Sequence, residues 1–277
     1  MGWAGRLDLH YRRDDRGGTT AHDRHEGPLR VLQRLYPEGP QVCHHVLVHP
    51  PGGIVGGDVL EIDALLDEGT HALITTPGAT RFYRSAGDTA RQAARLRLAA
   101  GARCEWLPLE AIAYSGCRAL NALRFELEPG AQMIGWDVVA LGLPAAGQAF
   151  EDGVFEQCLD WPGAWRERGR IAADDRRLLD SPLGLGGHRV LATAWFAGGT
   201  AWPEPMRDRL LELARDAAGA SPLARLAGST SPQPGLVVTR ALADRVEPAM
   251  ALLQAVRAAW REAAWSLPAH PPRVWRT

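Results

Sequence analysis

The amino-acid sequence predicts a mainly β fold, a mostly antiparallel or coiled sheet assembly with helices only near the C-terminal end. Between residues 59 and about 160, apolar and polar residues alternate in short segments, which is the pattern of half-buried strands. Gly or Pro ends each segment, as at Pro77-Gly78 and Pro129-Gly130. Because no helical periodicity lies between these segments, βαβ units are not expected.

The expected strands follow one another along the chain. An apolar run at 42–48 and an alternating segment at 59–66 come first. Residues 71–76, 95–98 and 123–128 continue the pattern, and each is closed by Gly or Pro. A short strand at 236–240 follows the stretch 228–235, whose Ser, Thr and Pro content is typical of a flexible loop.

Two helices are expected after residue 200. Apolar residues recur at helical spacing from Met206 to Ala217, between Pro203 at the start and Gly219 at the end. A second helix begins near Glu247 and ends before Pro268. The tail 271–277 contains aromatic and apolar residues, so we expect it to pack back on the domain.

The composition bounds the function. The chain has 277 residues, 46% of them hydrophobic, and a formal net charge of −1, which gives no reason to expect nucleic acid or an anionic membrane as the main partner. All 31 basic residues are Arg, so the lysines of P-loop, Schiff-base and protein-kinase sites are absent. Without an apolar leader or a run of about 18 apolar residues, the protein is expected to be soluble and cytoplasmic.

Cysteine and histidine give weak signals for metal binding. The cysteines at 43, 104, 117 and 158 form no C-x-x-C pair, which favours free buried thiols. His22 and His25 could hold a metal on a helix or tight turn, or could belong to a solvated polar segment. His44 and His45 are neighbours in an expected strand, so they should point to opposite faces and cannot chelate as a pair.

The stretch His49-Pro50-Pro51-Gly52-Gly53-Ile54-Val55-Gly56-Gly57-Asp58 is predicted to be a shaped turn between two strands. Its Gly pairs permit positive φ, and its Pro pair stiffens the entry. No helix and no lysine follow, so a phosphate cradle is not favoured. The turn holds Asp58 at a fixed place.

Four carboxylates stand beside Gly, Pro, aromatic or Arg residues: Asp58, Glu110, Asp137 and Glu167. They could bond neighbouring turns or, for Glu167, form a surface ion pair. Alternatively, two of Asp58, Glu110 and Asp137 could form the acid/base pair of a hydrolase or transferase, which would bring them within about 10 Å in one cleft. A third reading is a structural adaptor without any bound ion.

Six ordered motifs carry a resemblance to a known family. Besides the stretch 49–58, they are Gly27-Pro28-Leu29-Arg30-Val31, Leu35-Tyr36-Pro37-Glu38-Gly39, Thr75-Thr76-Pro77-Gly78-Ala79-Thr80-Arg81-Phe82-Tyr83-Arg84-Ser85, Glu105-Trp106-Leu107-Pro108 and Pro272-Arg273-Val274-Trp275. In this order they resemble the urease accessory protein D family, from about residue 5 to 277.

The resemblance implies a single domain over 1–277, with a coiled or right-handed β-helix-like strand assembly and two helices near the C-terminus. It implies a non-enzymatic scaffold that binds apo-urease and accessory protein F directly, and the GTPase accessory protein G through F. Such proteins help to insert nickel into urease, and the ion is thought to pass through an internal tunnel lined by carboxylates and hydroxyls. Nickel would then be transient cargo, with no tightly bound cofactor.

By match to the family pattern, the candidate nickel contacts are Asp58, Ser85, Asp137 and Glu167, with His49, Thr75 and Thr76 as further candidates. Dispersed oxygen ligands suit an ion that must be released, because clustered His and Cys would hold Ni²⁺ tightly. The chain departs from the pattern at Leu109, Arg81 and Leu143, which stand where Gln, Lys and Arg are usual. The loss of a polar group at 109 weakens the case for Glu110 as a metal contact.

Overall fold

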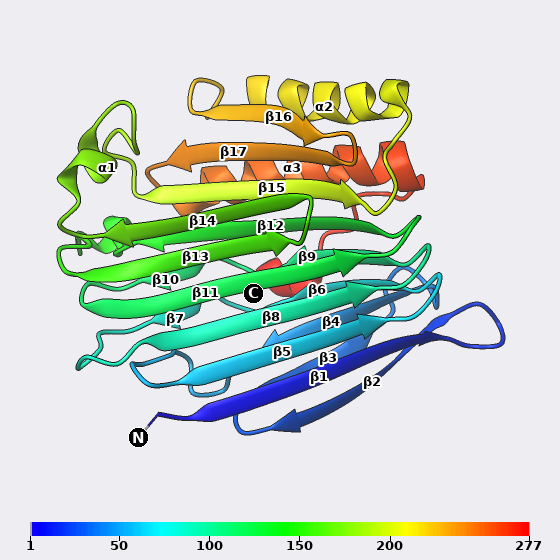
Figure 1. Cartoon of the computed structure of the whole chain (residues 1–277), viewed down its shortest axis with the longest axis horizontal. Coiled ribbons are helices and arrows are strands. Elements are labelled where there is room, and N and C mark those ends of the chain that lie inside the picture. Colours follow the sequence, from blue (N-terminus) through cyan, green and yellow to red (C-terminus); the bar gives the residue numbers. More distant parts are fainter. Residues whose placement is uncertain (1, 277) are drawn as a thin grey trace.

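A computed structural model describes residues 2–276. Within this range the chain forms two sheets (Figure 1), which we call sheet A and sheet B. Sheet A has seven strands, in the spatial order β14 (Trp165–Ala172), β13 (Gly153–Trp161), β11 (Cys117–Leu127), β8 (Ala90–Leu98), β5 (Val59–Leu66), β1 (Ala4–Arg13) and β2 (Thr19–Glu26).

Sheet B has ten strands over the same described residues. Eight follow one path, in the order β16 (Ala227–Gln233), β17 (Leu236–Ala243), β15 (Val190–Gly198), β12 (Gln132–Leu141), β9 (Arg103–Leu107), β6 (His71–Thr75), β4 (Val42–Val48) and β3 (Arg30–Leu35). The short strands β7 (Thr80–Phe82) and β10 (Ala111–Ala113) pair beside β12, off this path.

Apart from the short strands β7 and β10, the chain alternates between the sheets from β4 to β13. Within sheet A, β5, β8, β11 and β13 pair in parallel, and so do β4, β6, β9 and β12 within sheet B. Antiparallel pairs occur at the sheet ends, where β2, β3, β14, β15, β16 and β17 join. This is a solenoid-like winding, so the coiled alternative of the predicted assembly is confirmed.

Alternation along the strands places one core between the sheets. In sheet A, the inner positions of β5 are buried and the outer positions carry acids or lie at partial exposure. Phe82, Phe125, Phe155 and Trp195 are among the fully buried residues of this core. The strands of sheet A therefore need only one apolar face, whereas β12 of sheet B is buried on both faces.

A second core lies between sheet B and the helices α2 (Glu204–Gly219) and α3 (Val246–Trp265). Leu210 of α2 and Leu253, Val256 and Trp260 of α3 are fully buried in it. Both helices lie close to their predicted ranges and pack on β12, β15, β16 and β17 (Figure 1). Three short helices, η1 (Pro144–Ala146), α1 (Arg176–Asp180) and η2 (Arg273–Arg276), complete the described elements.

The tail packs back as predicted. The Trp275 ring lies 5.3 Å from that of Trp136, and its Nε1 donates to the Thr75 hydroxyl at 2.8 Å. The loop expected at 228–235 was wrong in part, because Ala227–Gln233 forms strand β16. Ser229 and Thr239 explain the pairing, since their hydroxyl oxygens lie 2.9 Å apart across β16 and β17 in a buried position.

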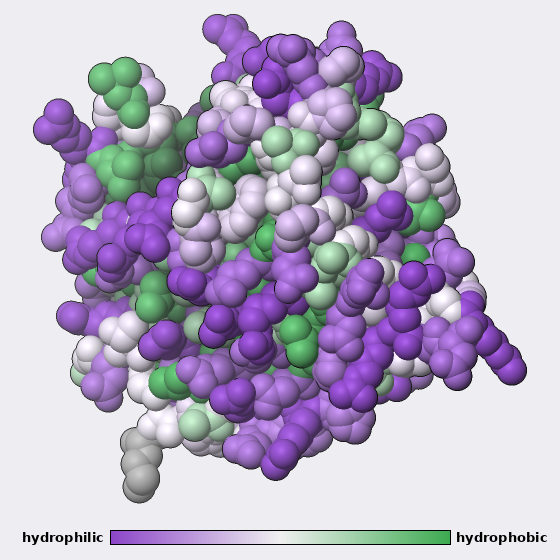
Figure 2. All heavy atoms as spheres, turned by 45° about the vertical axis from the view of Figure 1, so that its right-hand side comes forward, coloured by the Kyte–Doolittle hydropathy of each residue, from purple (hydrophilic) through white to green (hydrophobic). Residues whose placement is uncertain are grey.

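The outer face of sheet A is charged, in line with the mostly hydrophilic surface in Figure 2. Cross-strand ion pairs such as Arg97–Asp63 at 2.6 Å and Arg124–Asp160 at 3.1 Å run across it. Among the described residues, no helix is both long and apolar enough to cross a membrane.

Candidate functional site

A cavity of about 340 Å³ lies between the two sheets, below the corner turn at 49–58. It opens where exposed residues of two turns, including Gly52, Gly78 and Arg81, form part of the lining. Its walls are apolar side chains of both sheets, such as Ile62 of β5 and Ile74 of β6. The polar lining residues include His49, Thr75, Thr76 and Thr80, of which Thr75 is buried and the other three are partly exposed.

His49 has an orphan nitrogen at this opening. Its Nε2 is buried and has no hydrogen-bond partner among residues 2–276. Burial lowers the pKa of His49, and the nearby Asp58 opposes this shift. A neutral imidazole with a free nitrogen can accept a hydrogen bond or bind a cation.

A second, much smaller cavity lies next to the first. It shares Thr80, Gln92, Trp106 and Pro108 with the large cavity, and its volume is about 20 Å³. Such a volume holds about one water-sized particle. Asp137 and Asn121 line this inner cavity, so a carboxylate lies next to the larger cavity, with four lining residues shared between the two.

Asp137 is a buried carboxylate without an ion-pair partner among the described residues. It lies on β12 between Trp136 and Val138, which face the helices, so alternation turns Asp137 toward sheet A. Its Oδ2 accepts a hydrogen bond from Asn121 Nδ2 at 3.3 Å. Burial raises the pKa of Asp137 to about 6, and a hydrogen bond from Gln157 opposes the shift.

A row of amides crosses the inner face of sheet A opposite Asp137. Gln92 of β8, Asn121 of β11 and Gln157 of β13 are direct cross-strand neighbours. Gln92 Nε2 donates to Asn121 Oδ1 at 3.2 Å. An amide row is unusual in a core that is otherwise aliphatic and aromatic, and each amide offers an oxygen as well as a donor.

The row continues on sheet B toward the far edge. Asp137 is opposite Thr193 on β15, and Thr193 is opposite Arg240 on β17. Arg240 forms an ion pair with Glu167 of β14, across the gap between the sheets. We call this set the inter-sheet polar row, and it consists of Gln92, Asn121, Gln157, Asp137, Thr193, Arg240 and Glu167.

Asp58 and Ser85 lie elsewhere, in the turns around the corner. Asp58 Oδ1 accepts from the Trp3 amide at 2.7 Å, and its Oδ2 accepts from the Val55 amide at 3.0 Å. Ser85 donates to the Asp88 carbonyl and accepts from the Gly87 amide at 3.0 Å. Neither residue lines the two cavities. The structure thus places Asp137 and Glu167 in the polar row, and Asp58 and Ser85 in the corner.

Glycine is required in this corner for two different reasons. Gly52 and Gly57 have φ angles of +80° and +90°, which favour glycine. Gly56 has no such angle, but a Cβ there would lie 2.2 Å from Ser85 Oγ. The prediction that the stretch is a shaped turn fixing Asp58 agrees with these contacts.

The other candidates occupy different environments. Thr75 donates to the Leu107 carbonyl at 2.6 Å, and Thr76 donates to the Gly78 carbonyl at 3.0 Å. Burial raises the pKa of Glu110, which does not line the cavity at Asp137. Asp58, Glu110 and Asp137 therefore share neither of these two cavities, contrary to what an acid/base pair among them would need.

The histidine pairs are separated by strand geometry. His22 and His25 are three positions apart on β2 and lie exposed on opposite faces. His44 and His45 point to opposite faces as predicted, with His44 Nε2 at 2.8 Å from Glu38 Oε1 and His45 Nδ1 at 2.9 Å from the Tyr11 hydroxyl. No cluster of three or more His, Cys, Asp or Glu suited to a metal ion occurs among residues 2–276.

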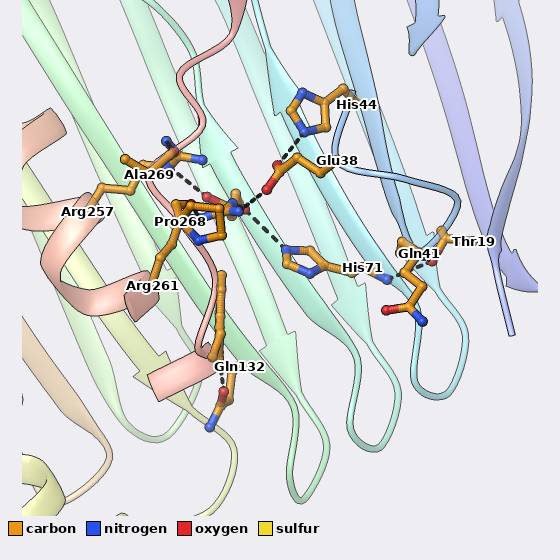
Figure 3. A network of polar contacts seen from close by, with 12 residues as sticks. Thr19, Glu38, Gln41, His44, His71, Gln132, Arg257, Arg261, Pro268 and Ala269 are labelled. Atoms are coloured by element: carbon orange, nitrogen blue, oxygen red, sulfur yellow. Dashed lines mark hydrogen bonds and ion pairs between the residues drawn. The ribbon is translucent and has the colours of Figure 1, made fainter. Parts of the chain in front are cut away.

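Sequence analysis missed a buried charge cluster between sheet B and α3 (Figure 3). Its centre is Glu105 of β9, which is fully buried and pairs with Arg257 at 2.6 Å and with Arg261. His71 Nε2 lies 3.1 Å from Glu105, and Arg261 also pairs with Glu38. The signal was present in the sequence as two arginines four residues apart on the apolar face of a helix.

The charges of this cluster compensate one another. Burial alone would raise the pKa of Glu105, but Arg257, His71 and Arg261 outweigh it and hold this pKa far below its usual value. Two carboxylates face two guanidinium groups, so the cluster has no excess charge for a ligand. We interpret it as the attachment of α3 to sheet B.

The fold and the site define a solenoid-like β protein with a helical cover and a polar row between its sheets. Comparison with known families identifies which protein of this kind it is. The model of the UreD urease accessory protein family matches residues 4–276, and the chain belongs to this family. Curated relatives named urease accessory protein UreD agree over the full length of both chains: 63% identity to that of Leptothrix cholodnii, 58% to that of Variovorax paradoxus and 56% to that of Methylibium petroleiphilum.

Proposed function

We propose that this chain is a urease maturation factor, a scaffold and nickel conduit that helps insert nickel into apo-urease. Membership of the UreD family supports the role in urease maturation. The observation that carries the conduit is Asp137, a buried carboxylate that lacks an ion-pair partner among residues 2–276 and lines a small cavity next to the larger one that opens at the corner. In this proposal the chain itself catalyses no reaction.

The residue types suit an ion that passes and is released. Ni²⁺ is held strongly by clustered imidazole and thiolate ligands, whereas single carboxylates, amides and hydroxyls bind it weakly. The polar row offers oxygens one at a time, and the described part of the chain has no metal cluster. Nickel would accordingly be transient cargo, and no tightly bound cofactor is proposed.

The proposed path enters at the corner and runs along the polar row. His49 and the threonine hydroxyls stand at the opening, Asp137 follows at the inner cavity, and Glu167 stands at the far edge. Asp58 and Ser85 are kept as candidate contacts near the opening. Their backbone hydrogen bonds give them a second role, which is to shape the corner.

The proposed partners are accessory protein F and the urease apoprotein by direct contact, and the GTPase accessory protein G through F. The net charge of −1 gives no attraction to nucleic acid or an anionic membrane, so neither is proposed as a partner. Maturation of urease would take place in the cytoplasm.

Asp137→Leu tests the proposal. The change removes the only acid among the described residues that line the inner cavity, but keeps a side chain of similar size. We expect co-expressed urease to lose most of its activity and nickel content, while pull-downs still recover the complex with accessory protein F and urease. The matched control is Asp216→Leu, at an exposed position of α2, which should leave both readouts unchanged.

Two results would overturn the proposal. If the wild-type chain recovered neither partner in the pull-down, the role as a scaffold would be wrong. If Asp137→Leu left the nickel content of urease unchanged, nickel would not pass Asp137. Loss of complex assembly in this variant would instead assign Asp137 a structural role.

A further inference from the structure

The two carboxylates of the inter-sheet polar row differ in how their charge is compensated. Asp137 is surrounded by amides and lacks an ion-pair partner within residues 2–276. Glu167 is paired with a guanidinium, that of Arg240. A cation that reaches Asp137 meets an uncompensated negative charge. At Glu167, the guanidinium of Arg240 already compensates the carboxylate.

The position of Arg240 lets it leave that carboxylate. It lies on β17, and its side chain is 49% exposed, compared with 29% for Glu167. Its neighbours Thr239 and Ala241 are buried on the helix side, so alternation turns Arg240 toward the gap between the sheets. Because half of the side chain already contacts solvent, the guanidinium can turn outward without entering an apolar environment.

Aromatic residues lie close to the Glu167–Arg240 ion pair, at the edge where β14 approaches sheet B. The ring of Trp165, from the same inner face of β14 as Glu167, lies 5.9 Å from that of Trp195. Gln233 Nε2 donates to the Ala164 carbonyl at 3.0 Å and joins the strand ends of the two sheets. The Glu167–Arg240 pair therefore joins the two sheets at the end of the polar row, next to these contacts.

We propose that Arg240 is a displaceable gate that occupies Glu167 at rest and turns out to solvent when a divalent cation arrives. This inference rests on the proposed nickel conduit and names the residue that controls its far end. The exchange replaces one positive charge on the carboxylate by two, and repulsion between the cation and the guanidinium favours the outward position of Arg240. Arg remains charged at any physiological pH, so the opening of the gate depends on the binding of the cation and not on the protonation of Arg240.

The gate should be easy to open because the ion pair is partly exposed. Exposed pairs contribute little net free energy, since water solvates both partners well once they separate. Nickel can therefore displace Arg240 without a tight site, and Arg240 can return when nickel leaves. A fully buried pair such as Glu105–Arg257 could not serve in this way, because separation would leave two desolvated charges.

The test is equilibrium dialysis of the full-length protein against NiCl2, with Arg240→Gln and Arg240→Lys. We expect Arg240→Gln to bind nickel about two- to fivefold more tightly, the range that exposed ion pairs contribute. Arg240→Lys keeps the charge and should stay near wild type. Arg168→Gln, which breaks an exposed pair with Glu156 on the outer face, is the matched control and should change nothing.

A double variant at Glu167 and Arg240, together with the control variant at Arg168, decides whether the effect comes from this ion pair. Glu167→Gln removes the carboxylate, so adding Arg240→Gln to it should give no further gain in affinity. Equal nickel affinity of Arg240→Gln and wild type would overturn the gate, as would an identical gain in Arg168→Gln. If Arg240→Gln fails to fold, Arg240→Met keeps the apolar stem and carries the same expectation.

The failure of the gate and the failure of the conduit are distinguishable. Asp137→Asn should weaken nickel binding if the conduit exists. A loss in Asp137→Asn together with no effect of Arg240→Gln would refute the gate alone. No effect of Asp137→Asn would refute the conduit on which the gate rests.

Discussion

Asp137 is kept in the folded protein at a cost. The residue is 9% exposed, and its carboxylate has amide neighbours, but among the described residues it has no cation beside it. Glu105 is more deeply buried, yet its pKa is lowered because Arg257 and Arg261 face it. The two buried acids of sheet B therefore have different roles. Glu105 stabilises the fold through its ion pairs, whereas Asp137 places a carboxylate without an ion-pair partner in a cavity.

The pKa of Asp137 predicts a pH-dependent gain in stability for Asp137→Asn. The folded pKa is about 6 and the ordinary value is 3.8, so the unfolded chain releases its proton first as the pH rises. Folded stability is therefore lost between these two values and stays lower above pH 6. Removing the charge should stabilise the protein by up to about 3 kcal/mol at pH 8, and by little at pH 4.

Urea unfolding of wild type and Asp137→Asn at pH 4 and pH 8 measures this difference. The Asn amide can still bond Asn121 and Gln157, so the comparison isolates the charge. A gain of equal size at both pH values would show that packing, and not ionisation, separates the two proteins.

The sequence singled out Asp137 and Glu167, but their environments could not be predicted from it. Strand β12 is buried on both faces. The sequence pattern therefore does not show which face of the strand Asp137 lies on, or what that face packs against. The partner of Glu167 is Arg240, 73 positions away by the residue numbers, on a strand of the other sheet. Asp58 was interpreted from its turn, and there the local sequence sufficed to predict a fixed carboxylate.

At the scale of elements, α3 is attached to sheet B through the charge cluster as well as through apolar packing. Arg257 Nη1 and Arg261 Nε also donate to the carbonyls of Ala269 at 2.7 Å and Pro268 at 3.0 Å. The same two side chains therefore hold both the sheet and the chain that follows the helix. Figure 3 shows these carbonyls beside the arginines.

Glu105→Gln should detach this helix in part. The change removes the carboxylate that pairs with Arg257 and one of the two that pair with Arg261, and breaking a buried ion pair typically costs about 3–5 kcal/mol. We expect a lower urea midpoint and faster amide exchange in α3 and the tail. Glu126→Gln is the matched control, because Glu126 pairs with Arg95 and Arg124 on the exposed face of sheet A and such pairs contribute at most about 1 kcal/mol.

The same comparison tests the interpretation of the cluster. An equally small loss in both variants would mean that apolar packing alone attaches α3. The helices α2 and α3 and the strand β5 were predictable because each has a strong local period, and β4 because it is a continuous apolar run. Strand β16 was not, since its pairing depends on a hydroxyl contact with β17 and its own composition resembles a loop.

At the scale of the whole molecule, the winding of the chain creates the space that the function needs. Alternate strands enter alternate sheets, so residues near 50, 80, 92, 121 and 137 meet in one gap. Alternation with a period of two residues predicts that strands form, but it contains no information on which strands share a sheet. Parallel pairing of this kind joins residues far apart in sequence, and only the family resemblance indicated it.

Thr80→Phe should close the proposed path without disturbing the fold. Thr80 is one of the four residues that line both cavities. An added ring there would fill space between the larger cavity of about 340 Å³ and the inner one, and so block the proposed path to Asp137. Co-expressed urease should then lose nickel content while the complex with accessory protein F still forms.

Thr20→Phe, at an exposed position of β2, adds the same ring outside the gap and should change neither the nickel content of urease nor complex formation. Normal nickel content in Thr80→Phe would contradict the proposed path, because the space between the opening and Asp137 would be filled.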